Sequence, residues 1–148
     1  MPTTRQANIH DIEQLSALFD AYRQFYQQAP NLTLAKTYIA ARIESQESVI
    51  FVAENNAQKL IGFCQIYPSF CSIITAKIGV LYDLFVAEFA RKTGAGRALI
   101  LAAHEYATNN GMARLDLSTA KDNLKAQALY ESLGWIRDEV FYTYSKEF

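Results

Sequence analysis

One strand–loop–helix passage in the second half of the chain constrains the fold and the function more than any other. An apolar run typical of a strand, 77–86, leads into a loop with Gly94 and Gly96, and that loop opens a helix-forming stretch. At a helix start the first backbone N–H groups lack partners, and the helix dipole adds partial positive charge. Because glycines allow close approach, the passage predicts a cradle for a diphosphate, to which Arg91 and Arg97 would add charge-assisted bonds. A tight turn before a helix is the plainer alternative for a Gly-x-Gly pair.

Two other phosphate-binding patterns can be tested against this loop. The Walker pattern requires a Lys-Ser/Thr pair after the glycines, and none is present. The dinucleotide pattern wants glycine or alanine where Leu99 stands, but Asp116 lies about 20 residues on, as a ribose-binding acid would. The chain has one strand–helix–strand unit of this kind, so a dinucleotide site is kept only as an alternative.

The hydrophobic periodicity around this passage changes several times between helical and strand spacing. The order is a short N-terminal strand, two helices, an antiparallel meander, helix, strand, helix and closing strands, which indicates a mixed α+β sheet rather than an alternating one. Pro68 should end or fray the second meander strand, because it cannot donate a backbone hydrogen bond. The expected helices are 12–28, 34–44, 98–109 and 123–133, and the expected later strands are 49–53, 60–67, 77–86, 113–117, 135–136 and 140–144.

Composition and length predict one globular domain, 1–148. Of the 148 residues, 51% are hydrophobic and 20% are charged, a balance that argues against disorder, and no linker divides the chain. The net charge of −1 gives no reason to expect a nucleic-acid partner. No apolar run is long enough to span a bilayer, and residues 1–10 lack the core of a signal peptide. We therefore expect a cytoplasmic protein without a membrane partner, with Cys64 and Cys71 reduced.

Two motifs in this order resemble those of the GNAT superfamily of acyltransferases. Residues 91–96 (RKTGAG) resemble its Q/R-x-x-G-x-G/A signature, and 123–135 (NLKAQALYESLGW) resembles its N-x-x-A-x-x-L-Y-E-K-x-G-F segment. The likeness extends to the opening strand and helix around 5–15, and 65–70 looks like the branch of polyamine and histone-tail acetyltransferases. It implies a GNAT-like mixed, mostly antiparallel central sheet with a splayed parallel strand pair and helices on both faces.

The resemblance also implies a binding site for acetyl-CoA as co-substrate. The pyrophosphate would lie on backbone amides of the glycine loop, and the pantetheine arm would pair like an extra strand with the unsatisfied edge of 77–86. Asn123 would cap its helix or bond to the pantetheine. The implied cofactor-binding residues are Leu84, Phe85, Val86, Arg91, Lys92, Thr93, Gly94, Ala95, Gly96, Arg97, Asn123 and Tyr130.

Two side chains are candidates for the catalytic chemistry. Tyr130 occupies the family position whose hydroxyl points at the thioester sulfur, where it would donate to the departing thiolate; a half-buried core aromatic is the alternative. Asp83 is the one acid inside its strand, and we expect it to share a face with Leu81 and Phe85. A lone carboxylate there is costly unless it is solvated or paired. Asp83 therefore either faces the substrate, to bind or deprotonate an amine, or forms a structural ion pair with an arginine.

The predicted function is transfer of an acetyl group from acetyl-CoA to a primary amine, by direct attack without a covalent enzyme intermediate. The acceptor would be a small polyamine, an amino metabolite or a peptide lysine, bound by Tyr22, Tyr26, Gln65 and Asp83. A non-catalytic acyl-CoA-binding sensor or partner module is the alternative from a different class. No cluster of side chains has metal-ligand spacing, so no metal is expected. The alternating apolar residues of 141–144 predict a homodimer.

Overall fold

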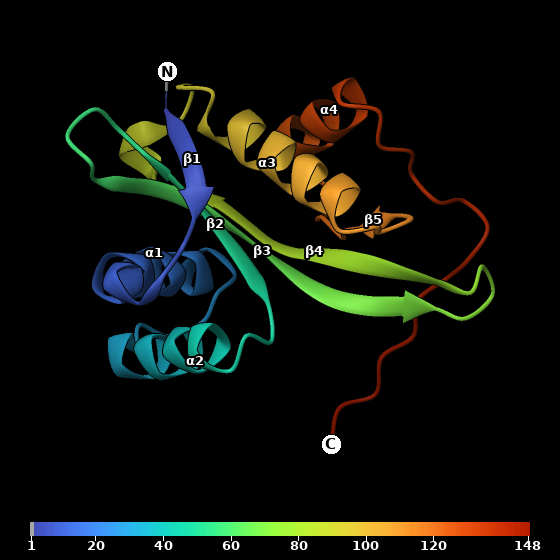
Figure 1. Cartoon of the computed structure of the whole chain (residues 1–148), viewed down its shortest axis with the longest axis horizontal. Helices are drawn as coiled ribbons and strands as arrows, with labels where there is room; N and C mark the ends of the chain where they lie inside the picture. The colour runs from blue at the N-terminus through green and yellow to red at the C-terminus, as the bar shows by residue number, and fades with distance from the viewer. Residues whose placement is uncertain (1) are drawn as a thin grey trace. The chain divides into compact units, whose positions relative to one another are not determined.

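The computed structural model describes residues 2–148, in two compact units, Met1–Leu117 and Ser118–Phe148. The first unit contains a five-stranded sheet in which β1 to β5 follow one another in sequence order (Figure 1). Neighbouring strands are antiparallel except β4 and β5, which are parallel. Its elements are β1 (Thr3–Gln6), η1 (Ile9–Asp11), α1 (Ile12–Phe25), α2 (Leu32–Glu44), β2 (Val49–Glu54), β3 (Leu60–Cys71), β4 (Ala76–Val86), η2 (Glu88–Ala90), α3 (Ala95–Asn109) and β5 (Leu115–Asp116).

Helices cover both faces of this sheet. In Figure 1, α1 and α2 lie together on one face and α3 crosses the other. Leu15 of α1 and Ile39 of α2 pack with Val52 and Phe63 of the sheet, and all four are fully buried. Burial of each such side chain contributes about 1.5–3 kcal/mol. The arrangement confirms the predicted mixed α+β fold with a parallel strand pair at the end of the sheet. No helix in the described part of the chain is long and apolar enough to cross a membrane.

Local capping decides where the helices begin and end. The side-chain oxygen of Asn31 accepts a hydrogen bond from the Leu34 N–H at 3.0 Å, so α2 starts before the predicted residue 34. Gly94, with a φ of 87°, precedes Ala95 as the cap of α3, which also starts earlier than predicted. The first helix stops short of residue 28, because Gln27 takes a left-handed φ of 67°.

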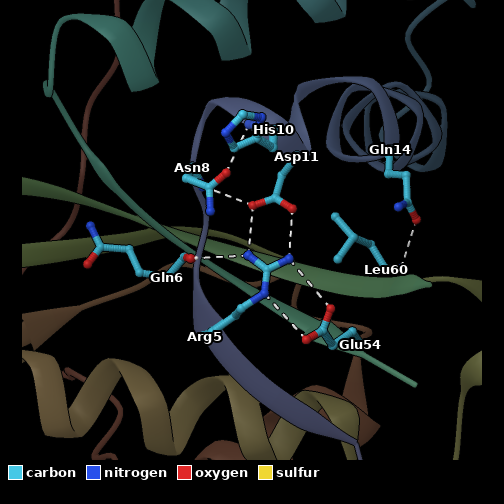
Figure 2. Close-up of polar contacts among 8 residues, drawn as sticks. All are labelled: Arg5, Gln6, Asn8, His10, Asp11, Gln14, Glu54 and Leu60. Atoms are coloured by element: carbon cyan, nitrogen blue, oxygen red, sulfur yellow. Dashed lines mark hydrogen bonds and ion pairs between the residues drawn. The ribbon is translucent and has the colours of Figure 1, made fainter. Parts of the chain in front are cut away.

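A hydrogen-bonded network ties the first strand to the first helical turn (Figure 2). Asn8 and Asp11 form a capping box: Asn8 accepts from the His10 N–H at 2.9 Å, and Asp11 accepts from the Asn8 N–H at 2.8 Å. The guanidinium of Arg5 donates to both carboxylate oxygens of Asp11, each at 2.8 Å, and to Glu54 at 3.3 Å. These bonds with Arg5 hold the pKa of Asp11 below its usual range, and they join β1, β2 and the start of α1.

A bulge in β4 changes which residues share a face of the sheet. Gln65 of β3 pairs with Asp83, whereas the next residue, Ile66, pairs with Leu81. Tyr82 is therefore the extra residue in β4. The prediction that Leu81 and Asp83 share one face is wrong, because the bulge turns them to opposite faces, with Asp83 toward α1.

β3 continues through Pro68, so the prediction that this proline ends or frays the strand is wrong. β2 pairs with β3 only as far as Ile66, and beyond it β4 is the one strand beside β3 among the described residues. A proline is tolerated at such an edge, because its missing N–H can face away from the ladder. The edge segment 67–71 thus extends the two-stranded ribbon of β3 and β4 beyond β2 (Figure 1).

The second unit contains α4 (Leu124–Ser132) and, over Ser118–Phe148, no strand, so the predicted strands at 135–136 and 140–144 are wrong. Its backbone donors bond locally instead. The N–H groups of Val140 and Phe141 donate to the Asp138 carboxylate at 3.0 and 3.3 Å. Donors engaged in this way are not available for a strand ladder.

Candidate active site

Asp83 is a buried carboxylate, 4% exposed, in β4. Its Oδ2 accepts a hydrogen bond of 2.7 Å from Nε2 of Gln65, its partner across the strands. Burial raises the pKa of Asp83, against the opposing effect of hydrogen bonds from Gln65 and Tyr22. Within residues 2–148 no ion pair joins Asp83 to a basic side chain, so the arginine partner considered as an alternative is absent there.

Tyr22 of α1 covers the same carboxylate. Its ring packs edge-to-face on Phe63 and Phe85, at centroid distances of 5.7 and 6.0 Å. Its hydroxyl donates to the Tyr82 carbonyl at 3.4 Å. Burial, together with the charge of Asp83, raises the pKa of Tyr22 above its usual range, so the phenol stays protonated at neutral pH.

A pocket of about 500 Å³ opens beside Asp83, a size suited to a small ligand. Asp83 is the one charged residue of its otherwise largely aromatic wall. The other predicted acceptor-binding residues do not line it: Gln65 is fully buried, and Tyr26 packs against the ring of Tyr22 at 5.2 Å. The lining residues are Phe19, Tyr38, Tyr67, Pro68, Ser69, Val80, Tyr82 and Asp83.

The loop before α3 presents backbone donors, as a diphosphate cradle requires. Gly94 has a φ of 87°, and Lys92 has a left-handed φ of 64°. The Ala98 N–H donates to the Gly94 carbonyl at 3.0 Å, and helix geometry leaves the N–H groups of 95–97 without intrahelical partners. The Thr93 hydroxyl donates to the last carbonyl of η2 at 2.7 Å, which closes the turn. The loop therefore fits an anionic group such as a pyrophosphate.

The two arginines of this loop have different surroundings. Arg91 donates from Nε to the Val86 carbonyl at 3.2 Å, and its guanidinium lies 5.9 Å from the ring centre of Phe85. Arg97 is exposed in the first turn of α3. Both positive charges lie close in sequence to the unpartnered N–H groups, where they add to the field that attracts an anion.

One edge of β4 is left without a strand partner. β5 pairs with β4 only at Gly79 and Val80. β3 occupies the opposite edge throughout, so the backbone of 84–86 (Leu84, Phe85 and Val86) has no strand beside it on the β5 side among residues 2–148. An extended chain such as a pantetheine arm could pair with this edge.

Asn123 and Tyr130 lie in the second unit, on or beside α4. The side-chain oxygen of Asn123 accepts from the Ala126 N–H at 3.3 Å, which is the capping role considered for it. Tyr130 is half-buried, and its ring lies 6.1 Å from that of Trp135. The catalytic and cofactor-binding roles of Tyr130 stay predictions.

Nothing in the sequence indicates that two further residues, Ser48 and Tyr82, belong to the surroundings of Asp83. Ser48 precedes β2, and its Oγ donates to Oε1 of Gln65 at 2.6 Å. Tyr82 is the bulge residue, 67% exposed, on the pocket wall. A polar residue before a strand and an aromatic within one are both common, so neither pattern indicates a site. The pairing of β2, β3 and β4 is what assembles them.

Comparisons with known proteins agree with this fold. The model of the acetyltransferase (GNAT) family matches residues 13–135. The chain is 45% identical over 140 residues to the uncharacterized N-acetyltransferase YhfO of Bacillus subtilis, which covers 95% of this chain and 93% of that protein. It is 36% identical over 96 residues to a probable acetyltransferase of Haemophilus influenzae, covering 65% of this chain and 66% of that one. A crystal structure of a probable acetyltransferase is similar with a TM-score of 0.92 at 33% identity, over 99% of this chain and 97% of that one.

The family match spans both motifs, the glycine loop at 91–96 and the segment 123–135. Relatives that align over most of the chain are named N-acetyltransferases or acetyltransferases, and the solved relative shares the fold. The chain therefore belongs to the acetyltransferase (GNAT) family, and it is an acyltransferase that depends on acetyl-CoA.

Proposed function

We propose that this acetyltransferase moves the acetyl group onto a small cationic primary amine whose ammonium group binds at Asp83. The observation that carries the proposal is the state of Asp83, a buried acid with no basic partner within residues 2–148, on the wall of an aromatic pocket. An unpaired buried charge is costly, and a cationic ligand would offset that cost. Tyrosine faces such as that of Tyr82 add cation–π attraction.

Among the acceptor classes considered, a small polyamine or a small amino metabolite suits this pocket better than a peptide lysine. A volume of about 500 Å³ accommodates a short aliphatic amine. The segment 65–70, which resembles the polyamine and histone-tail branch, supplies Tyr67, Pro68 and Ser69 to the pocket lining, and this resemblance covers both acceptor classes.

The residues proposed to hold acetyl-CoA are those of the loop and the strand edge. The amides of Lys92, Thr93, Gly94, Ala95, Gly96 and Arg97 would bind the pyrophosphate, and the backbone of 84–86 would pair with the pantetheine arm. Arg91 and Arg97 would add charge, and Asn123 would contribute a polar group besides its capping bond. When bound, acetyl-CoA supplies the acetyl group as a thioester.

Proton handling falls to Asp83 and Tyr130. A free alkylamine has a pKa of about 10.4, so a group must take its proton before it can act as a nucleophile, and Asp83 would do so directly or through water. Tyr130 would donate a hydrogen bond to the departing sulfur. A thiol nucleophile on the protein has no support at Cys64, because burial raises the pKa of that thiol to about 12. We therefore exclude Cys64 as a nucleophile and propose direct transfer to the amine.

The experiment that tests the proposal is free-thiol release from acetyl-CoA against polyamines, amino acids, aminoglycosides and lysine peptides, with calorimetry of CoA binding in parallel. We expect amine-dependent release that is strongest with small polyamines or amino metabolites. Release only with lysine peptides would overturn the choice of acceptor. CoA binding without release from any amine would favour the non-catalytic sensor, and absence of CoA binding would reject the cofactor site.

The proposal includes a homodimer. Several large apolar side chains of the second unit are well exposed, and residues of this kind commonly become buried against another subunit. They are Ile136, Val140, Phe141, Tyr142, Tyr144 and Phe148. Light scattering at micromolar concentration should give twice the mass of one chain, and a monomeric mass would reject this part.

A cytoplasmic location, without nucleic acid or membrane as partner, is also proposed. Cys64 and Cys71 are both free, as expected in a reducing compartment. The net charge of −1 lacks the basic surplus typical of nucleic-acid binding. Recovery of the protein in the membrane fraction of lysed cells would contradict this location.

A further inference from the structure

Behind the acceptor pocket, three side chains form a continuous chain of hydrogen bonds that ends at the carboxylate. Ser48 Oγ donates to Gln65 Oε1 at 2.6 Å, and Gln65 Nε2 donates to Asp83 Oδ2 at 2.7 Å. Gln65 is fully buried, Asp83 is 4% exposed and Ser48 is half-buried. Of the three, only Asp83 lines the pocket, so Ser48 and Gln65 reach the pocket only through it.

We infer that Ser48 and Gln65 are positioning residues, which hold the Asp83 carboxylate ionised and oriented and so set the pH range in which the site binds and deprotonates an amine. The role of the amine rests on the proposed function. The state of Asp83 does not, and it can be measured without any substrate.

The glutamine amide gives this chain of bonds a direction. One end of the amide accepts and the other donates, although the two ends have nearly the same shape. With its oxygen bonded to the Ser48 hydroxyl, the NH₂ group faces Asp83 and stabilises the charged form. A reversed amide would place its oxygen against the carboxylate, an arrangement that bonds only when Asp83 is protonated. Gln65 therefore opposes the effect of burial on this acid.

Ser48 supports the arrangement by satisfying an atom that has no access to water. Oε1 belongs to a fully buried side chain, and it accepts a hydrogen bond from the Ser48 hydroxyl. A buried acceptor left without a donor is costly, because it has lost its hydrogen bonds to water. Donation from Ser48 also polarises the amide, which strengthens the next bond in the chain. Loss of Ser48 should therefore weaken the bond between Gln65 and Asp83.

Asp83 is the one carboxyl group among the titratable groups that interact here, and burial raises its pKa. The titratable groups whose charge interacts with it are Tyr22 from α1 and Cys64 and Tyr67 from β3. Burial raises the pKa of each: that of Cys64 to about 12, and those of the two tyrosines above their usual range. All three stay protonated up to a pH of about 9. A change of state below that pH therefore reports Asp83.

The experiment follows the Asp83 carboxyl carbon by NMR in protein labelled with ¹³C-aspartate, assigned with Asp83→Asn. In Gln65→Leu the titration midpoint should move to higher pH by about one pH unit, since a hydrogen bond to a charged group is worth about that much. Ser48→Ala should move it the same way by less, and Ser48→Thr, which keeps the hydroxyl, should restore it. Ser16→Ala is the matched control, because the buried Ser16 hydroxyl has no hydrogen-bond partner within residues 2–148. Thermal melts identify variants that do not fold. If Gln65→Leu does not fold, the titration midpoint of Ser48→Ala tests the inference in its place.

A double-mutant cycle tests whether Ser48 acts through Gln65. Adding Ser48→Ala to Gln65→Leu should leave the midpoint unchanged, and a full additional shift would overturn that relationship. Identical midpoints in wild type, Ser48→Ala and Gln65→Leu would overturn the whole inference. The acidic limb of the pH profile of kcat/KM should move with the NMR midpoint. If the wild type releases no thiol with any amine, the proposed function fails while the NMR titration still decides the positioning roles.

Discussion

The hydroxyl oxygens of Tyr38 and Tyr67 lie 2.6 Å apart, which joins α2 to the edge segment of β3 along one wall of the acceptor pocket. The ring of Tyr38 also stacks on that of Phe19 at a centroid distance of 5.4 Å. Both tyrosines and Phe19 line the pocket, so its width depends on contacts between a helix and a strand that lie far apart in the sequence.

Tyr67→Phe should widen the pocket and raise the KM for the amine by about fivefold, because loss of one hydrogen bond is worth about 1 kcal/mol. The affinity for CoA should stay unchanged. Steady-state kinetics and calorimetry measure the two. Tyr106→Phe is the control, since Tyr106 lies on α3 and packs on Phe51 at 5.9 Å, outside this pocket. An unchanged amine KM in Tyr67→Phe would contradict the prediction.

Asp83→Asn should lower amine-dependent turnover by about 100-fold or more, because it removes the proton acceptor.

The same substitution, Asp83→Asn, should raise the melting temperature at neutral pH. Burial raises the pKa of Asp83 in the folded state, so ionisation costs folding free energy. That cost appears as the pH rises through the unfolded pKa of about 3.9 and is complete above the folded pKa.

Thermal melts from about pH 3 to pH 8 check this sign. The melting temperature of Asp83→Asn should exceed that of wild type at the upper end of this pH range, and the difference should vanish at the lower end. Asp116→Asn is the control, because the Asp116 side chain is half-exposed and pairs with Arg114 at 2.8 Å. A variant that is less stable than wild type at pH 8 would show that Asp83 is a structural acid.

Gly94→Ala should weaken CoA binding by about tenfold or more. Gly94 has a φ of 87° at the start of α3, and a side chain there costs about 1 kcal/mol in strain and obstructs the approach of a phosphate. Gly111→Ala is a matched control after the other end of the same helix, with a φ of 67° and no atom within 4 Å of an added Cβ. Both variants should lose similar stability, and only Gly94→Ala should lose affinity in calorimetry.

Tyr130→Phe should lower kcat clearly, by about tenfold or more, and leave CoA affinity nearly unchanged, because the ring stays and only the hydrogen bond to the leaving sulfur is lost. Tyr142→Phe, also in the second unit and well exposed, is the control. Wild-type turnover in Tyr130→Phe would remove the catalytic assignment.

Asp11→Ala should lower the free energy of unfolding at pH 7 by about 1–3 kcal/mol, since it removes a cap and the partner of Arg5. Because Arg5 holds the pKa of Asp11 below its usual range, this stabilisation is present above the unfolded pKa of about 3.9 and is lost as the pH falls through the folded pKa. Urea unfolding at pH 7 and at about pH 3 measures the difference. Glu139→Ala, which breaks the exposed pair with Arg137, should change stability little.

The features that could be predicted from the sequence alone are those that depend on local chemistry. Gly94 and Gly96 after an apolar run predict a loop that leads into a helix. This prediction needs only local information, because it depends on backbone conformation and on the unpartnered N–H groups at a helix start. The order of helices and strands, and with it the mixed sheet, followed from hydrophobic periods that local geometry imposes. Helix ends were missed where a cap such as Asn31 or a left-handed residue such as Gln27 decided the boundary.

The faces of β4 and the surroundings of Asp83 were decided by tertiary structure. The bulge at Tyr82 exists only in the pairing of β3 with β4, and it reverses the alternation that would place Asp83 beside Leu81. Ser48 meets Gln65 because β2 and β3 pair in one particular register. The edge position of Pro68 and the local bonds of 138–141 likewise depend on which strands are neighbours. Sequence periodicity records whether a residue is apolar, whereas register, bulges and strand edges arise from contacts between distant segments, and these contacts placed a buried acid, an amide and a hydroxyl in one chain of hydrogen bonds.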